Sequence, residues 1–440
     1  MKTFAKGFGI ALLGGALVIG FSPLLFSPSL LKNGNAFINA ITPDKKTPEK
    51  TPEELIQEAR ARSSNIKALY MTADVANDPG ADAARLRAEI IGIVETTEIN
   101  ALVIDVKEVC GADFNEERLP KLLNELRARN IWVIARIAAF KDASQIKTHP
   151  EWYVTRKAAK TVREGGCRGK QHLVAKGNGA TPTPIFWRDD AGGYWLDPAS
   201  PEVHEYLLNF SKRMIDAGFN ELQFDYIRFP SDGDVLQALY PVWNRTTPRY
   251  DVMKSFFTSL RDNLKSHKPD IILSADIFGY VAAHHEDQTI GQRLSDIATV
   301  FDYVSFMVYP SHYYTGLYFA ADPARGLPAI NYTAGEARAN PGVTVGRSLL
   351  MAQDYFDFVA STTHAASSPE HTKTIARIRP WLEDFFHEAD RLANRPWGTQ
   401  KVRLQIEAAE DATSHGWMLW NAANIYTEEA LTEQSWNSPN

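Results

Sequence analysis

The sequence predicts an α/β fold, a (β/α)8 TIM barrel preceded by an N-terminal hydrophobic anchor or signal segment. Short apolar runs recur eight times along the chain, and most are nearly continuous in apolar residues. That pattern is typical of parallel strands buried on both faces. Helical patterns lie between the runs, and eight β-then-α units in series favour a closed barrel.

The eight runs are the expected barrel strands. They are ALYMTA (68–73), ALVIDV (101–106), IWVIARIAAF (131–140), ELQFDYIRF (221–229), IILSADIF (271–278), YVSFMVY (303–309), the weaker RPWLEDF (379–385) and WMLWN (417–421). An open doubly wound sheet is the alternative. No Gly-x-Gly-x-x-Gly follows the first run, so the barrel is favoured.

Helices are expected over residues 81–97, 117–130 and 201–218. The first carries apolar residues at helical spacing, and the last opens with proline and closes on glycine, the usual asymmetry of helix ends. The connections over 141–220, 230–270 and 310–376 are long. In a barrel of this kind, large insertions after strands build a substrate cleft.

The composition suits a globular protein. The chain has 440 residues, of which 44% are hydrophobic and 23% charged, and its formal net charge is −6. This mildly acidic balance gives no basis for electrostatic attraction to nucleic acid, so no nucleic-acid partner is expected. With two cysteines, a disulfide scaffold or a Cys-rich zinc module is excluded.

The first 31 residues predict export. Lys2 and Lys6 form a short basic front, and residues 7–31 carry no charge. As a helix, that run would extend about 37 Å, enough to cross a hydrocarbon core of about 30 Å. The basic front would stay inside, so the bulk of the chain would be periplasmic or extracellular. An uncleaved membrane anchor and a cleaved signal peptide both remain open.

A linker is expected over residues 32–62 and the TIM-barrel domain over 63–440. Residues 42–54 are rich in Thr, Pro and charge, a composition that cannot form a core. An exported domain can oxidise Cys110 and Cys167 to a disulfide, and two unpaired thiols are the alternative.

Polar residues at the ends of otherwise apolar strands indicate where the chemistry lies, because a buried charge is costly unless it is paired or used. Asp225 and Asp276 end the fourth and fifth runs. Neighbouring parallel strands lie about 4.8 Å apart, so the two carboxyls are expected to face each other. Close carboxyls separate their pKa values, as glycoside cleavage requires. The alternative is that they pair with basic residues and only close the barrel mouth.

Other polar and aromatic residues at the strand ends are candidates for binding substrate. Asp105 and Lys107 share one face by the period of two and form either a substrate clamp or a structural ion pair. Arg136 is expected to support a carboxylate from behind it. The remaining candidates are Arg228, Tyr309, His312, Trp420 and Asn421.

No metal or other cofactor is expected. His284 and His285 are adjacent, so their side chains diverge, and no HExxH or HxH pattern occurs. A Gly-x-Ser-x-Gly elbow and a Walker loop are also absent from the sequence.

Several segments together resemble a bacterial glycoside hydrolase family whose (β/α)8-barrel domain was long catalogued as of unknown function. They are ALYMTADVA (68–76), NALVIDVKEVCG (100–111), IARIAAFKD (134–142), WLDPASPEV (195–203), GFNELQFDYIRFPSDG (218–233), SADIFGY (274–280), IGQRLSDIATVFDYVSFMVYPSHY (290–313), IRPWLEDF (378–385) and GWMLWNAANIY (416–426). The resemblance implies a barrel and a carbohydrate substrate. The family's strand-end carboxylates fall on Asp105, Asp225 and Asp276.

The chain departs from the family pattern in the Glu-Val-Cys after Lys107 and in a longer, more basic insertion at 156–186. The resulting hypothesis is an exported or membrane-tethered glycoside hydrolase acting on an envelope or extracellular polysaccharide. Asp225 would be the nucleophile or base and Asp276 the general acid. A non-catalytic glycan-binding barrel and a metal-dependent deacetylase are the alternatives.

Overall fold

The computed structural model describes residues 50–157, 185–285, 287–366 and 375–432, and the barrel belongs to the unit Thr51–Asn440. A closed ring of eight parallel strands forms its centre. The strands are β1 (Ile66–Met71), β2 (Ala101–Glu108), β4 (Trp132–Ala138), β6 (Glu221–Asp225), β8 (Ile272–Phe278), β9 (Tyr303–Met307), β13 (Trp381–Glu383) and β14 (Gly416–Trp420). Because β1 pairs with both β2 and β14, the barrel is closed, as predicted.

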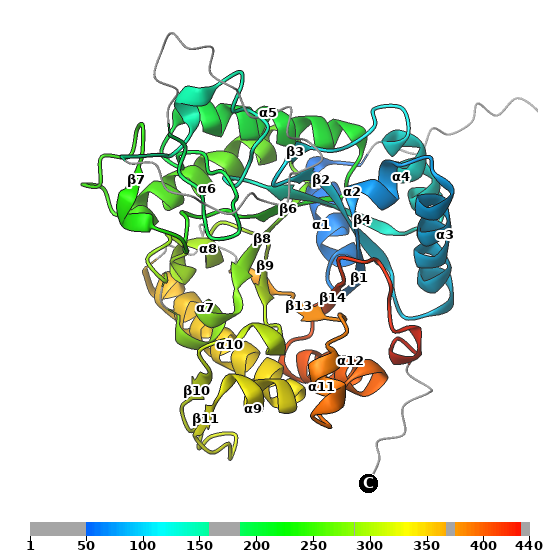
Figure 1. Cartoon of the computed structure of the whole chain (residues 1–440). Helices are drawn as coiled ribbons and strands as arrows, with labels where there is room; N and C mark the ends of the chain where they lie inside the picture. The colour runs from blue at the N-terminus through cyan, green and yellow to red at the C-terminus, as the bar shows by residue number, and fades with distance from the viewer. Residues whose placement is uncertain (1–49, 158–184, 286, 367–374, 433–440) are drawn as a thin grey trace, which may run out of the picture. The chain divides into compact units, whose positions relative to one another are not determined.

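Helices surround the ring of strands, as Figure 1 shows. The three expected helices are present as α3 (Ala81–Thr96), α4 (Leu119–Ala128) and α5 (Pro201–Ala217). The other long outer helices are α6 (Arg249–His267), α10 (Pro341–Ala366) and α12 (Gly398–Ala412). Shorter helices are α2 (Ala73–Asn77), α7 (Gly279–His284), α8 (Leu294–Ala298), α9 (Ala334–Ala339) and α11 (Glu388–Leu392). The apolar face of each long helix packs on the outside of the barrel.

Small strands build out the loops. β3 (Gly111–Ala112) extends the sheet beside β2. β5 (Thr155–Arg156) pairs with β7 (Ala238–Leu239), and β10 (Leu317–Phe319) pairs with β11 (Ile330–Tyr332). β12 (Arg377–Ile378) pairs with β9 just before the weak seventh run, and Arg379 and Pro380 separate it from β13, the strand that the run itself forms.

The sequence predicted that the folded domain starts at Ser63, but the structure has a helix before this residue. Helix α1 (Pro52–Arg62) occupies the end of the expected linker 32–62. Thr51 caps it: its hydroxyl accepts from the Glu54 amide, and the Glu54 side chain accepts from the Thr51 amide. This reciprocal cap and the proline in the first turn stabilise a helix even in a charged segment.

The N-terminal segment 1–31 lies outside the described residues, so the anchor or signal stays a prediction. Within the described ranges, no helix combines the length and the hydrophobicity that crossing a membrane requires. Cys110 is in a disulfide. Cys167, the other cysteine of the chain, also lies outside the described residues, so its predicted pairing stays a prediction.

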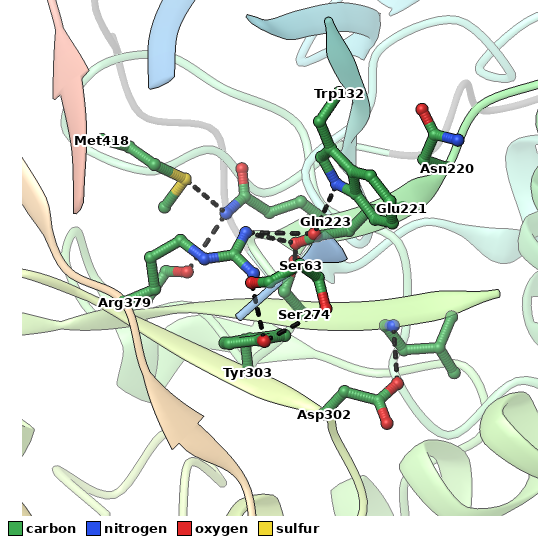
Figure 2. A network of polar contacts seen from close by, with 12 residues as sticks. Ser63, Trp132, Asn220, Glu221, Gln223, Ser274, Asp302, Tyr303, Arg379 and Met418 are labelled. Atoms are coloured by element: carbon green, nitrogen blue, oxygen red, sulfur yellow. Dashed lines mark hydrogen bonds and ion pairs between the residues drawn. The ribbon is translucent and has the colours of Figure 1, made fainter. Parts of the chain in front are cut away.

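A network of buried polar contacts joins residues of several barrel strands (Figure 2). The Arg379 guanidinium lies 3.0 Å from both carboxylate oxygens of Glu221, and both side chains are fully buried. Glu221 also accepts hydrogen bonds from Ser274 Oγ at 2.6 Å and Trp132 Nε1 at 3.2 Å. Each carboxylate oxygen therefore has partners, as a buried charge requires.

The start of β14 depends on a glycine. Gly416 has φ +82°, and a Cβ added there would lie 2.0 Å from the Ile66 carbonyl oxygen of the neighbouring strand. Gly416→Ala is therefore expected to lower the free energy of unfolding by about 3 kcal/mol or more, through backbone strain and displacement of β1. Chemical denaturation measures this change.

The matched control is Gly326→Ala. Gly326 has a similar φ of +70°, but nothing lies within 4 Å of an added Cβ. This variant carries only the backbone cost, about 1 kcal/mol. Equal losses for the two variants would show that the contact with β1 does not matter.

Candidate active site

The two predicted carboxyls, Asp225 and Asp276, lie at matching heights on adjacent strands. The register pairs Phe224 of β6 with Ala275 of β8, so the next residue of each strand is one of the aspartates. Both side chains line one cavity of about 630 Å³. The structure thus brings the two carboxyls to a shared hollow at the carboxyl end of the barrel, where such folds place their active sites.

One guanidinium joins the acidic residues of this rim. Arg136 on β4 contacts Asp105 Oδ1 at 2.6 Å through Nη1, Asp225 Oδ2 through Nη2, and Asp276 Oδ2 at 3.7 Å through Nε. Its side chain is 14% exposed and also lines the cavity. Arg136 therefore fixes the spacing of the two catalytic candidates, since both contact the same planar group.

Asp276 lies in a drier environment than its partner. The side chain is 1% exposed, and its Oδ1 accepts a hydrogen bond from Trp381 Nε1 at 2.7 Å. Burial raises the pKa of the Asp276 carboxyl well above its ordinary value, and the charge of Asp225 raises it further, against the opposing effect of Arg136. A carboxyl with a raised pKa holds its proton and can act as a general acid.

Asp225 is held by strained backbone. The next residue, Tyr226, has φ +48°, a conformation that a bulky side chain rarely adopts. In this conformation the Tyr226 amide donates to Asp225 Oδ1 at 2.6 Å, while Oδ2 is paired with Arg136. Strain of this kind persists where the surrounding structure fixes a functional group.

Aromatic side chains form one wall of the cavity. The Trp420 ring lies 6.1 Å from Tyr309 with an interplanar angle of 28°, and 5.5 Å from Phe385. Tyr314, 71% exposed, continues the aromatic lining outward past His312. Flat apolar surfaces of this kind suit the C–H faces of sugar rings.

His312 is held by a buried chain of polar groups. Ser311 Oγ donates to Glu383 Oε2 at 2.5 Å and lies 2.9 Å from His312 Nδ1. Glu383 is paired in turn with Lys401. Burial lowers the pKa of His312, so the ring faces the cavity as neutral imidazole near pH 7.

Three predicted binding residues do not line the cavity. Asp105 is 1% exposed and is held by Arg136 and the Tyr70 hydroxyl. Lys107 is fully buried and pairs with Asp142 at 2.8 Å. Asn421 donates to the Asp384 and Ile425 carbonyls, both at 2.6 Å. Lys107 and Asn421 hold loops around the site, and Asp105 links β2 to β1 and β4.

Asp105 and Lys107 were expected on one face, and this expectation was wrong. The register between β2 and β4 shifts between these two residues. This irregularity breaks the period of two, so the two side chains take different partners. The other predicted residues Arg136, Arg228, Tyr309, His312 and Trp420 do line the cavity.

Several cavity residues escaped the sequence analysis. Trp381 lies in the weak seventh run, where alternation from Arg379 would have placed it inward beside Glu383. The other cavity-lining residues that the sequence did not single out are Lys141, Tyr226, Ser231, Asp232, Phe278, Gly279, Tyr280, Gln288 and Met307. Most of these lie in loops after strands, whose paths a sequence pattern does not predict.

Among the described residues, no group of three or more His, Cys, Asp or Glu side chains is placed to hold a metal ion.

Comparison with known protein families assigns this barrel to a family. Residues 68–426 match a family described as "putative glycosyl hydrolase domain". The protein is a glycoside hydrolase with a (β/α)8 barrel. It belongs to that putative glycosyl hydrolase domain family, which covers nearly the whole described barrel. No curated protein matches the chain in sequence.

A solved glycoside hydrolase domain shares the fold. The PgaB (BpsB) glycoside hydrolase domain from Bordetella bronchiseptica is 12% identical, over 84% of this chain and 100% of that one, with a TM-score of 0.52. Two further solved structures have lower TM-scores. A hypothetical protein from Ruminiclostridium thermocellum is 26% identical over 47% of this chain and 96% of that one, with a TM-score of 0.35. The α-galactosidase TtGalA from Thermus thermophilus is 14% identical over 88% and 66%, with a TM-score of 0.44.

Proposed function

We propose that the protein hydrolyses glycosidic bonds in an envelope or extracellular polysaccharide, with Asp276 as the general acid and Asp225 as the base or nucleophile. The observation that carries the proposal is the unequal environment of two carboxyls in one cavity. Asp276 is 1% exposed, accepts from Trp381 and lies 3.7 Å from Arg136, whereas Asp225 is 10% exposed and pairs more closely with Arg136. Glycoside cleavage needs one protonated and one ionised carboxyl.

In the proposed reaction, the Asp276 carboxyl protonates the oxygen of the departing sugar as the glycosidic bond breaks. In the same step Asp225 either attacks the anomeric carbon, forming a glycosyl-enzyme that water then hydrolyses with Asp276 as base, or removes a proton from the water that attacks this carbon. The aromatic wall around Trp420 would stack on the substrate rings, and the neutral His312 imidazole can hydrogen-bond their hydroxyls. Export, by an anchor or a cleaved signal, would bring the barrel to its polysaccharide.

The proposal predicts that kcat/KM decreases at high pH and that this decrease reflects deprotonation of Asp276. The general acid must be protonated, so kcat/KM is expected to fall as the pH rises through the raised pKa of this carboxyl. Reducing-end release from envelope glycans, measured across pH, gives the profile. In Asp276→Asn, residual activity should lose this decrease at high pH, since an amide does not titrate there.

Leaving-group dependence separates acid catalysis from folding. Asp276→Asn is expected to lower kcat about 10²- to 10⁴-fold on natural glycans, which need a protonated leaving oxygen. Dinitrophenyl glycosides leave without a proton, so on these the loss should be small. The two substrates are compared in one preparation, which acts as its own folding control. Equal losses on both substrates, or full activity on both, would refute the general-acid role.

A further inference from the structure

Arg228 is a buried cation that the proposed reaction does not use. It follows β6 in the loop at the cavity, and it is 6% exposed. In the part of the chain that the structure describes, no carboxylate oxygen lies within ion-pair distance of it. Its one hydrogen bond to these described residues runs from Nη1 to the Phe229 carbonyl at 3.0 Å. A guanidinium has five N–H donors, so most of its donor capacity is unused.

Aromatic rings hold this guanidinium in place. Its central carbon lies 4.4 Å from the Phe278 ring centre, 5.0 Å from Trp195 and 5.6 Å from Tyr226. Such contacts attract a cation but accept no strong hydrogen bonds in its plane. The group is therefore oriented in advance while its donor edge stays available to the cavity that it lines.

The other cations of the cavity are already neutralised. Arg136 pairs with Asp105 and Asp225, and Lys141 pairs with Asp189 at 2.8 Å. Burial lowers the pKa of Arg228, consistent with a charge that has no close counter-ion. Taking a charge out of water without a partner costs several kcal/mol, so a site that keeps one is suited to an anion from outside.

Acidic residues of the same loop do not fill this role. Asp232 lines the cavity, but its oxygens accept from the Asp190 amide at 3.0 Å and the Ser231 hydroxyl at 3.1 Å. Asp190 in turn accepts from the Gly233 amide at 3.2 Å. These contacts tie two loops together, so among the described residues the remaining donors of Arg228 have no carboxylate partner.

We propose that Arg228 binds an anionic substituent on the substrate, so that the enzyme acts on an acidic polysaccharide. A uronic acid carboxylate fits the guanidinium edge with two parallel hydrogen bonds, and a sulfate or phosphate ester offers the same oxyanion chemistry. The inference rests on the proposed function in one respect, that this cavity is where the sugar binds. Because Arg228 lies beside Tyr226, it would hold the charged sugar next to Asp225.

The test uses matched glycans that differ in charge alone. Polyuronate oligosaccharides are compared with the same oligosaccharides after their carboxyls are reduced to alcohols, and separate arms use sulfated and phosphorylated oligosaccharides with their desulfated and dephosphorylated forms. Binding is measured by calorimetry on the full chain. The wild type is expected to bind at least one acidic form about 10- to 100-fold more tightly than its neutral partner, the range of charge-assisted hydrogen bonds.

Variants assign that preference to the residue. Arg228→Gln is expected to reduce the acidic-to-neutral ratio to about one, and Arg228→Lys to leave an intermediate ratio, since it keeps the charge but loses the bidentate edge. Arg85→Gln makes the same charge change on the exposed face of α3, where Arg85 is 59% exposed, and should keep the wild-type ratio. Arg228→Gln should also melt no lower than wild type, since it removes an unpaired buried charge.

The outcomes separate this inference from the hydrolase proposal. A wild-type preference for every neutral form, or an unchanged ratio in Arg228→Gln, overturns the inference even if neutral glycans are cleaved. Selective binding that depends on Arg228 supports it even if no glycan is cleaved, in which case only the hydrolase proposal fails. The arm with the largest ratio identifies the oxyanion.

Discussion

Replacement of Asp225 by asparagine is expected to lower kcat on cleavable glycans about 10⁴-fold or more, while binding of the glycan is kept. The amide preserves the shape of the carboxyl and can still accept from the Tyr226 amide. It removes the charge that attacks the sugar carbon or activates water. Reducing-end release at saturating glycan measures the loss, and calorimetry measures the retained binding.

Asp232→Asn is the matched control for this variant. It makes the same chemical change at the exposed rim of the same cavity, where Asp232 only ties loops together. Its kcat should stay within about tenfold of the wild type, the scale of a lost surface hydrogen bond. Full activity of Asp225→Asn, or an equal loss in the two variants, would remove Asp225 from the reaction.

Arg379→Met is expected to lower the free energy of unfolding by about 3–5 kcal/mol, the cost of leaving a buried charge without its partner. Glu221 would keep its contacts to Ser274 and Trp132 but lose the cation that neutralises it (Figure 2). This is a large share of the about 5–15 kcal/mol that stabilises a typical domain. Guanidinium denaturation at pH 7 measures the loss.

A second substitution distinguishes charge from packing. Glu221→Gln in the Arg379→Met background removes the unpaired charge and should restore part of the lost stability. Arg85→Met breaks the exposed Arg85–Glu89 pair and should cost less than about 1 kcal/mol. A double variant as unstable as Arg379→Met would assign the loss to the cavity left by the side chain.

The barrel was predictable because buried parallel strands leave a strong apolar signal. Even the weak seventh run contains a strand, β13, which Arg379 and Pro380 separate from the short β12 before it. Helix α1 was missed because Pro, Thr and charge in residues 42–54 resemble a tether. The Thr51 and Glu54 capping pair was the available signal, and it depends on local hydrogen bonds rather than on hydrophobicity.

The carboxyl pair was predictable from two facts, that the aspartates end consecutive strands and that inward positions alternate. The orientation of the Lys107 side chain was not predictable, because one shift in register reverses which face of the sheet a residue occupies. That Arg228 has no carboxylate partner among the described residues was also not predictable, for a different reason. Whether a cation has a counter-ion depends on loops distant in sequence, such as the one that carries Trp195.

The contact of Arg136 with three carboxyls has a consequence for how this rim can evolve. A change of any one acid alters the electrostatic field at the other two, so substitutions here are expected to be epistatic. Neutralising Asp105 alone, for example, leaves Arg136 free to draw more strongly on Asp225. New specificities would therefore arise more easily on the loops and aromatic wall than at this shared guanidinium.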